Sequence, residues 1–234
     1  MKKFLLSTSL IIAYAISLNA QVIFSQNFDT CTATSYAAEC IGAPWTTWSG
    51  TVGTTEDAVV SATQSSSAPN SAYIGATTTD FVVLLGDSTT GIYDISFDYF
   101  VETGKMGYFN ILNTFASTSV WAMECYARSS GYISWVAGGI EDSVTFSFNT
   151  WMEIGFNINL NTDAAIMSID GTDVMGWKFS SGSAGDGTTL KLGAMDFYGA
   201  SEGTVMPGYY IDDFTFEKVS SVGISENNND VSVY

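Results

Sequence analysis

The feature that most constrains the fold of this chain is the alternation of apolar and polar residues with a period of two. In the segment Ile92–Val101, apolar residues hold every second position, and Asp94, Ser96 and Asp98 stand between them. Successive side chains of a strand point to opposite faces, so this pattern predicts a strand that is covered on one face only. After residue 20, no stretch keeps a 3.6-residue apolar period over three turns. The sequence therefore predicts an all-β protein.

Further alternating segments follow, separated by turn signals such as Asp170-Gly171. The predicted strands are Val22–Phe28, Ala58–Ala62, Ala72–Gly75, Phe81–Leu85, Met106–Leu112, Ser119–Ala127, Tyr132–Ala137, Val144–Phe148, Met152–Leu160, Ala164–Ile169, Val174–Phe179, Leu190–Tyr198 and Tyr209–Glu217. So many short strands with short connections favour a two-sheet antiparallel sandwich with jelly-roll connectivity. No polar stretch is long enough to separate domains, and we expect residues 21–219 to form one unit.

The start of the chain has the pattern of a secretory signal. Lys2 and Lys3 precede an apolar run that ends at Leu18, and Ala20 offers a small residue for cleavage. The run is shorter than the roughly 20 residues of a membrane span. We expect residues 1–20 to be a signal peptide, with an uncleaved anchor helix as the alternative, and the rest to be secreted or on the cell surface without a membrane span.

The three cysteines divide into a pair and a single residue. Cys31 and Cys40 bracket a short, turn-rich loop, and disulfides persist outside the cytoplasm, so we expect these two to pair. Cys125 alternates with Trp121 and Met123 in an apolar strand and is predicted to be a buried free thiol.

The charge balance excludes several classes of function. The chain has 7 basic residues against 24 acidic ones, no His, and a net charge of −17. Such a chain repels nucleic-acid phosphates, so no nucleic-acid partner is expected. Without imidazole, the usual general base and the His-containing zinc sites are excluded as well. These absences favour binding over catalysis.

Residues 220–234 have the composition of a linker. The runs Gly223–Glu226 and Val231–Tyr234 resemble the opening of the C-terminal sorting domain of the type IX secretion system of Bacteroidetes. In that family a Pro-Asn-Pro step and a small β-domain follow, and this sequence stops before them. The segment is therefore interpreted as a linker or as the start of a truncated sorting domain.

A hairpin in the second half carries a second resemblance. Trp151–Leu160, a turn, Ala164–Ile169 and the tight Asp170-Gly171 turn look like the Trp-to-Asp-Gly hairpin of the laminin-G and pentraxin branch of the concanavalin A-like superfamily. The resemblance is specific at this hairpin and loose elsewhere. It implies a jelly-roll sandwich that binds carbohydrate or protein, often with calcium, and sometimes hydrolyses glycosides.

Candidate ligand-binding residues lie along this hairpin and near loops. Trp151, Glu153 and Asn157 share the outward row of one predicted strand, where an aromatic face beside polar groups suits a sugar ring; a solvated sheet face is the alternative. Trp177 lies near a loop, as do Trp45 and Trp48, and is a further stacking candidate. Arg128 ends its strand, where it either hydrogen-bonds sugar hydroxyls or neutralises a nearby acid. Trp121 and Trp135 are expected to fill the core.

The resemblance also implies a structural calcium ion. Modules of this kind hold it between an acidic residue of the final strand and a partner near the opening strand, which here gives Asp212, Asp213 and Asp29. The alternation places Asp212 on the same face as Phe214 and Phe216, so its carboxylate needs a cation, solvent or backbone donors. Acceptance of loop N–H groups is the alternative to calcium.

These observations favour a secreted, non-catalytic module that binds a polysaccharide or other glycan, or that adheres to a cell-surface protein. The enzyme alternative is a divergent hydrolase or lyase that uses Glu124 and Glu153, provided that they meet across strands. The Glu-x-Asp-x-Glu motif of the glucanase branch is missing, and neighbouring acids such as Asp212 and Asp213 diverge on a strand. A purely structural spacer of a surface protein is the third hypothesis.

Overall fold

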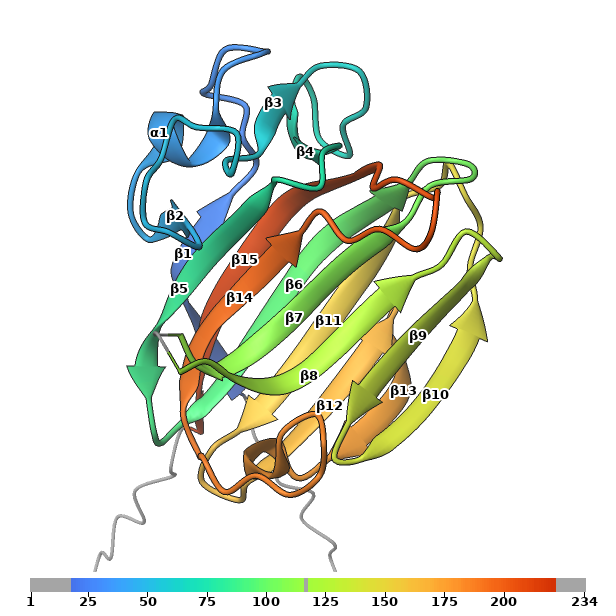
Figure 1. Cartoon of the computed structure of the whole chain (residues 1–234). Helices are drawn as coiled ribbons and strands as arrows, with labels where there is room; N and C mark the ends of the chain where they lie inside the picture. The colour runs from blue at the N-terminus through green and yellow to red at the C-terminus, as the bar shows by residue number, and fades with distance from the viewer. Residues whose placement is uncertain (1–17, 116–117, 222–234) are drawn as a thin grey trace, which may run out of the picture.

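The computed structural model describes residues 18–115 and 118–221, which form two antiparallel sheets packed face to face (Figure 1). Sheet A contains β1 (Leu18–Gln26), β3 (Val59–Ser61), β4 (Ser71–Ile74), β6 (Ile92–Val101), β11 (Met152–Asn159), β12 (Ala164–Ile169), β13 (Thr172–Trp177) and β15 (Tyr209–Ser221). Sheet B contains β2 (Trp45–Thr47), β5 (Asp80–Ser88), β7 (Gly107–Thr114), β8 (Val120–Ala127), β9 (Tyr132–Ala137), β10 (Ile140–Thr145) and β14 (Leu192–Tyr198). The predicted all-β sandwich is confirmed.

Both sheets join strands that are distant in the sequence. Sheet A has the order β13-β12-β11-β6-β15-β4-β3, with β1 also paired to β15, and sheet B has the order β10-β9-β8-β7-β14-β5-β2. The predicted hairpin is confirmed, because β11 pairs with β12 from Ile154–Ile169 to Asn159–Ala164. Helical structure is confined to α1 (Ala37–Ile41) and the short 3-10 helix η1 (Phe179–Ser181) within the described residues.

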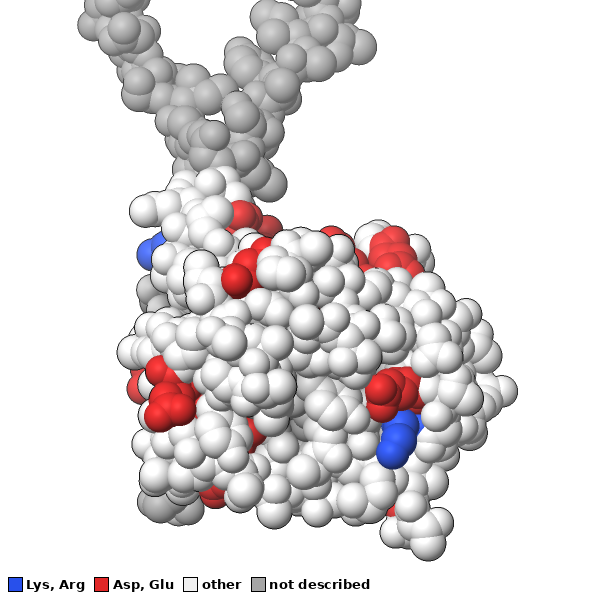
Figure 2. Space-filling view, turned by 90° about the horizontal axis from the view of Figure 1, so that it is seen from above, with Lys and Arg blue, Asp and Glu red and all other residues white. Residues whose placement is uncertain are grey.

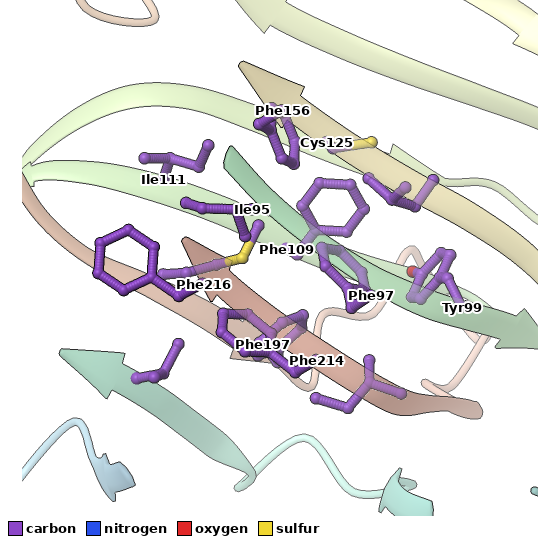
Figure 3. Close-up of a cluster of buried hydrophobic side chains, with 14 of the residues drawn as sticks. Ile95, Phe97, Tyr99, Phe109, Ile111, Cys125, Phe156, Phe197, Phe214 and Phe216 are labelled. Carbon is purple, nitrogen blue, oxygen red and sulfur yellow. The ribbon is translucent and has the colours of Figure 1, made fainter. Parts of the chain in front are cut away.

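The core between the sheets is largely aromatic, as Figure 3 shows. Phe97 of β6 meets Phe109 of β7 and Phe197 of β14 edge to face, with ring centroids 5.2 Å apart in each pair. Edge-to-face pairs of this kind stabilise a fold beyond the area that they bury. The inward positions of the alternating segments therefore meet their counterparts from the other sheet, as the pattern predicts.

The first third of the molecule is held by a disulfide and by side-chain caps. The predicted Cys31–Cys40 disulfide is confirmed, and Cys125 is a buried free thiol, as expected. The segment between Cys31 and Cys40 was expected to be a loop, but its last residues form the start of α1. Asp57 accepts the backbone N–H groups of Ala38 and Glu39 at the start of this helix, at 2.8 and 3.1 Å.

The two ends of the described chain lie side by side, because Leu18 of β1 pairs with Ser221 of β15 (Figure 1). Leu18–Ala20, the last residues of the predicted signal peptide, are the first of β1, and residues 1–17 lie outside the described residues. The last strand extends beyond the predicted Glu217 to Ser221, whereas the segment that resembles a sorting domain lies outside the described residues. Across residues 18–115 and 118–221, no helix has the length and apolarity that crossing a membrane requires.

Candidate functional site: an acidic and aromatic cleft on sheet B

The outer face of sheet B carries a cleft of about 260 Å³ that combines aromatic walls with carboxyl groups. We call it the acidic-aromatic cleft; its lining residues are Trp48, Asp80, Tyr108, Asn110, Trp121, Glu124, Asp196 and Tyr198. Strand register brings these residues together. Asn110 of β7 lies opposite Asp196 of β14 on one side and opposite Glu124 of β8 on the other. Asp80 of β5 pairs with Tyr198 and is therefore the diagonal neighbour of Asp196.

The floor of the cleft contains buried oxygen atoms that lack donors. Asp196 is 3% exposed and Asn110 is 1% exposed. Asn110 donates its side-chain N–H to Asp196 Oδ2 at 2.8 Å. Among the described residues, no N–H or O–H donor reaches Asp80 Oδ1, Asp196 Oδ1 or Asn110 Oδ1. Unsatisfied buried acceptors are rare in proteins and require a partner such as water, a proton or a ligand.

The carboxyl groups of Asp80 and Asp196 lie within hydrogen-bonding reach of each other, so a proton on one can be donated to the other. Burial, opposed by a hydrogen bond with Asp196 and assisted by the Glu56 charge, raises the pKa of Asp80 to about 6. Burial raises the pKa of Asp196 well above its ordinary value, and the adjacent Asp80 carboxyl adds to this. Two carboxylates in contact repel each other, so one of them retains a proton that hydrogen-bonds the other. The pair can therefore release a proton when a positive charge arrives.

Glu124 lies on the next strand and is held by two tyrosines. The hydroxyl groups of Tyr108 and Tyr126 both donate to Glu124 Oε1 at 3.1 Å. Burial, together with the Glu124 charge, raises the pKa of Tyr126 to about 12, so this hydroxyl keeps its proton. The guanidinium of Arg128 lies 5.1 Å from the Tyr126 ring centre and pairs with Glu202 at 3.3 Å. Arg128 thus neutralises a nearby acid, and its contact with sugar hydroxyls stays a prediction.

The aromatic wall includes a residue that was expected in the core. Trp121 is 37% exposed and stacks with Trp48 across the cleft, with ring centroids 6.5 Å apart and planes 16° apart. The prediction of a core position was wrong because β8 has a bulge: Met123 pairs with Ile111, but the next pair along the ladder is Trp121 with Leu112. The extra residue reverses the alternation and turns the Trp121 ring outward. Trp135 is 1% exposed and fills the core, as expected.

The five predicted ligand residues are not brought together. Glu153 and Asn157 are exposed on the outer face of sheet A, and Trp151, at the end of the same hairpin, packs against Phe100 with the ring planes tilted by 51°. Trp177 ends β13 and is buried in the core, while Arg128 follows β8 in sheet B. A ligand role for Trp151, Glu153 and Asn157 stays a prediction, and it concerns the face opposite to the cleft.

Glu124 and Glu153 do not meet across strands, which the enzyme alternative required of them. Glu124 lies between the core residues Met123 and Cys125 of sheet B, and Glu153 lies between the core residues Met152 and Ile154 of sheet A. Both side chains thus point outward from opposite sheets, with the core between them. Only Glu124 belongs to the acidic-aromatic cleft.

The three predicted calcium ligands are engaged with hydrogen-bond donors. Asp212 Oδ2 accepts the backbone N–H groups of Ser66 and Ser67, at 2.8 and 3.1 Å. Asp213 Oδ1 accepts the Ser67 hydroxyl, and Asp29 Oδ1 accepts the N–H of Asn70. Each of these carboxylates therefore accepts a hydrogen bond from the segment 66–70. Calcium binding stays a prediction that melting curves with added calcium and with a chelator would test.

The expectation that Asp212 shares a face with Phe214 was also wrong. Asp212 pairs with Asp98, while Thr215 pairs with Ser96, so β15 has one extra residue at this point. The bulge places Asp212 on the outer face beside Asp98, although the side chain is fully buried under the loop that contains Ser66. The alternative prediction, that Asp212 accepts loop N–H groups, is confirmed.

Sequence reasoning did not identify Asp80, Asn110 or Asp196 as site residues. A usable signal was present for Asp196, which interrupts the apolar run from Leu192 to Phe197 as its one charged residue. An acid in the middle of such a strand must face either solvent or a polar partner. The partner itself comes from β5 and β7, and its position follows from sheet topology rather than from sequence spacing.

Comparisons with known proteins identify solved structures that have a similar fold. No family model matches the chain, and no curated protein matches it. Among solved structures, a variant of the alginate lyase Aly36B in complex with alginate trisaccharide is similar, with a TM-score of 0.55 at 13% identity over 84% of this chain and 98% of that one. The botulinum neurotoxin serotype D binding domain gives a TM-score of 0.52 at 14% identity over 83% of this chain. A Trypanosoma rangeli sialidase in complex with the inhibitor DANA gives 0.52 at 8% identity over 83% of this chain.

The share of each similar structure that this chain matches differs. The matched part spans 47% of the botulinum chain, 30% of this sialidase and 19% of a further sialidase. At such low identity the likeness concerns the backbone arrangement and carries no side-chain role. The protein therefore shares the two-sheet β-sandwich fold of these structures.

Proposed function

We propose that the protein is a secreted, non-catalytic module that binds carbohydrate in the acidic-aromatic cleft, either free glycan or glycan on a surface to which it adheres. The observation that carries the proposal is the position of the stacked Trp48 and Trp121 rings beside buried acceptors that lack donors. A pyranose ring has an apolar C–H face for such rings and hydroxyl donors for such acceptors. The shared fold and the disulfide are consistent with this proposal.

The charge of the protein narrows the class of glycan. Figure 2 shows acidic side chains at several places on one face and few basic ones, in keeping with the net charge of −17. The lining of the cleft adds three carboxyl groups and no Lys or Arg among the described residues. Uronic-acid and sialic-acid polymers would be repelled by this surface. The proposed ligand is therefore a neutral or basic glycan.

A glycan array followed by calorimetry tests the proposal. We expect the parent protein to bind at least one neutral or basic glycan, and Trp48→Ala and Trp121→Ala each to weaken binding by about tenfold. Trp151→Ala is the matched control, since this Trp is also partly exposed but lies at the end of the sheet A hairpin. If Trp151→Ala alone lowers the affinity, the ligand lies on the predicted sheet A row instead. If no glycan binds, the proposed function is lost.

Glycoside hydrolysis is a second candidate, and one observation favours it. Asp80, with its pKa raised to about 6, and Glu124 line the same cleft, and glycosidases use one protonated and one ionised carboxyl group. Release of reducing sugars from a bound glycan, abolished in Asp80→Asn and in Glu124→Gln, would support it. Binding without release over the same incubation would leave the binding proposal in place.

A further inference from the structure

We propose that the acidic-aromatic cleft selects a sugar that carries a protonated amino group, such as a glucosamine unit, and holds its ammonium against the Asp80–Asp196 pair. This inference rests on the proposed carbohydrate-binding function and names the class of ligand for the same cleft. Three observations support this inference: the floor of the cleft lacks hydrogen-bond donors, carboxyl groups line the cleft, and aromatic rings form its walls.

The floor needs donors and offers almost only acceptors. Asp80 Oδ1, Asp196 Oδ1 and Asn110 Oδ1 are buried, and apart from a proton held between the two carboxyl groups they meet no N–H or O–H donor of the described residues. Asp196 and Asn110 are both more than nine-tenths buried, and both line the cleft. A hydroxyl group brings one donor to such a floor, whereas an ammonium group brings three, together with a positive charge.

Among the described residues, no Lys or Arg forms an ion pair with a carboxyl group of the cleft. Arg128 pairs with Glu202, and Lys191 pairs with Asp87 at 3.0 Å. The titratable groups around the Asp80–Asp196 pair are acids and phenols: Glu56, Glu124, Tyr108 and Tyr209. The proton shared by the pair therefore serves as its local counter-charge. A bound ammonium would replace this proton, which would then leave to solvent.

The walls favour an organic cation over a metal ion. The rings of Trp48, Trp121, Tyr108 and Tyr198 line the cleft, and aromatic faces attract ammonium groups through the ring quadrupole. Within residues 18–115 and 118–221, no three acidic, His or Cys side chains are grouped so that they could hold a metal. The combination of rings with carboxyl groups thus fits an ammonium attached to a ring with apolar faces, as in an amino sugar.

Calorimetry at pH 6 with matched oligosaccharides tests the inference. The probes are a glucosamine tetramer, the N-acetylglucosamine tetramer, tetralysine and calcium chloride. We expect the glucosamine tetramer to bind about tenfold or more tightly than its N-acetylated form, because acetylation removes the charge and two donors. Equal binding of the two sugars would overturn this inference and leave the proposed function standing. Failure of every glycan would overturn both, and tetralysine or calcium binding as tightly as the amino sugar would overturn the selection of a sugar.

Proton release gives a second readout that a merely structural role would not produce. Repeating the titration at pH 6 in buffers of different ionisation enthalpy should show about one proton released for each amino sugar bound. Asp196→Asn should still fold, because the amide can donate to Asp80 as the protonated acid does, and it should lose the release and about tenfold in affinity. Asp80→Asn is the second variant, and Asp94→Asn on sheet A is the control for net charge. Unchanged release in both cleft variants would contradict the inference.

Discussion

Trp48 and Trp121 stack nearly parallel, with ring centroids 6.5 Å apart, although one follows β2 and the other belongs to β8. The apolar residues beneath them, Val82, Leu112 and Ala194, form a small buried cluster on the outer face of sheet B. Trp48 packs against this cluster and also meets the Phe115 ring edge to face, with ring centroids 5.2 Å apart. Rings held in this way can accept a ligand without first becoming ordered, which favours affinity.

The exposed ring predicts a fluorescence signal for binding. Trp121 is 37% exposed, whereas Trp45 and Trp135 are 3% and 1% exposed. A sugar that covers Trp121 should shift the protein's emission to shorter wavelength, and titration of the bound glycan in a fluorimeter measures this. Trp121→Phe should keep much of the binding, because a ring remains, but lose most of the shift. A shift of unchanged size in that variant would mean that the ligand covers another Trp.

Raised carboxyl pKa values predict higher stability at mildly acidic pH. Burial raises the pKa of Asp212 to about 7, and that of Asp80 to about 6. An acid whose pKa is higher in the folded state binds its proton more tightly there, so folding is favoured at low pH. This stabilisation is lost as the pH rises from about 4, the ordinary pKa of Asp, to about 7. Melting temperature should therefore fall between pH 5 and pH 8, and repulsion among the excess acids acts in the same direction.

Asp212→Asn separates this effect from general repulsion. The amide oxygen can still accept from Ser66 or Ser67, but it does not ionise. The variant should lose part of the pH dependence, on the order of 2 kcal/mol in unfolding free energy between pH 5 and pH 8. Denaturant unfolding at both pH values measures it. Asp94→Asn serves as the control, and an equal loss in this control would show that net charge alone is responsible.

Gly107 is predicted to be intolerant of a side chain. A Cβ atom at this position would stand 1.9 Å from the hydroxyl oxygen of Tyr99, which is fully buried in the core. Gly107→Ala would force the Tyr99 ring to move against its neighbour Tyr209, and overpacking of this kind costs about 1–3 kcal/mol. Thermal melting would show it. Gly107→Ala with Tyr99→Phe should recover part of the loss, since Phe lacks the clashing oxygen.

The Cys31–Cys40 disulfide should contribute measurably to stability. It closes a loop with a sequence separation of 9, and the chain-entropy model assigns about 2–3 kcal/mol to a loop of this length. Cys31→Ser with Cys40→Ser should lower the free energy of unfolding by about that amount. A reductant should lower the melting temperature of the parent protein and leave that of the double variant unchanged. If the reductant affects both equally, another thiol is involved.

Alternation predicted the strands and the inward residues well, because burial on one face is a local pattern of period two. Phe97 and Phe109 are core residues in the predicted strands. The short spacing between Cys31 and Cys40 was enough to predict their disulfide. What alternation could not predict is the side of a residue near a bulge. Trp121 and Asp212 were both assigned to the wrong face for this reason.

The candidate site depends on which strands become neighbours. Asp80 and Asp196 lie far apart in the sequence and meet because β14 pairs with β5. Glu124 and Glu153 are closer in sequence, yet they lie on opposite sheets. Period-two patterns say nothing about sheet order, so the partner of each carboxyl group had to come from the structure.

The pairing of β1 with β15 determines how the molecule would respond to tension. Leu18 and Ser221 form the outermost pair of this antiparallel ladder, and Gln26 with Phe214 forms the innermost. A pull on the two ends would load one rung of hydrogen bonds at a time rather than all together. β1 would separate from β15 one residue pair at a time, at a lower force than shearing the two strands past each other requires. The segment closed by the Cys31–Cys40 disulfide would stay folded during this step. Single-molecule stretching would record this as an early, weak step before the main rupture.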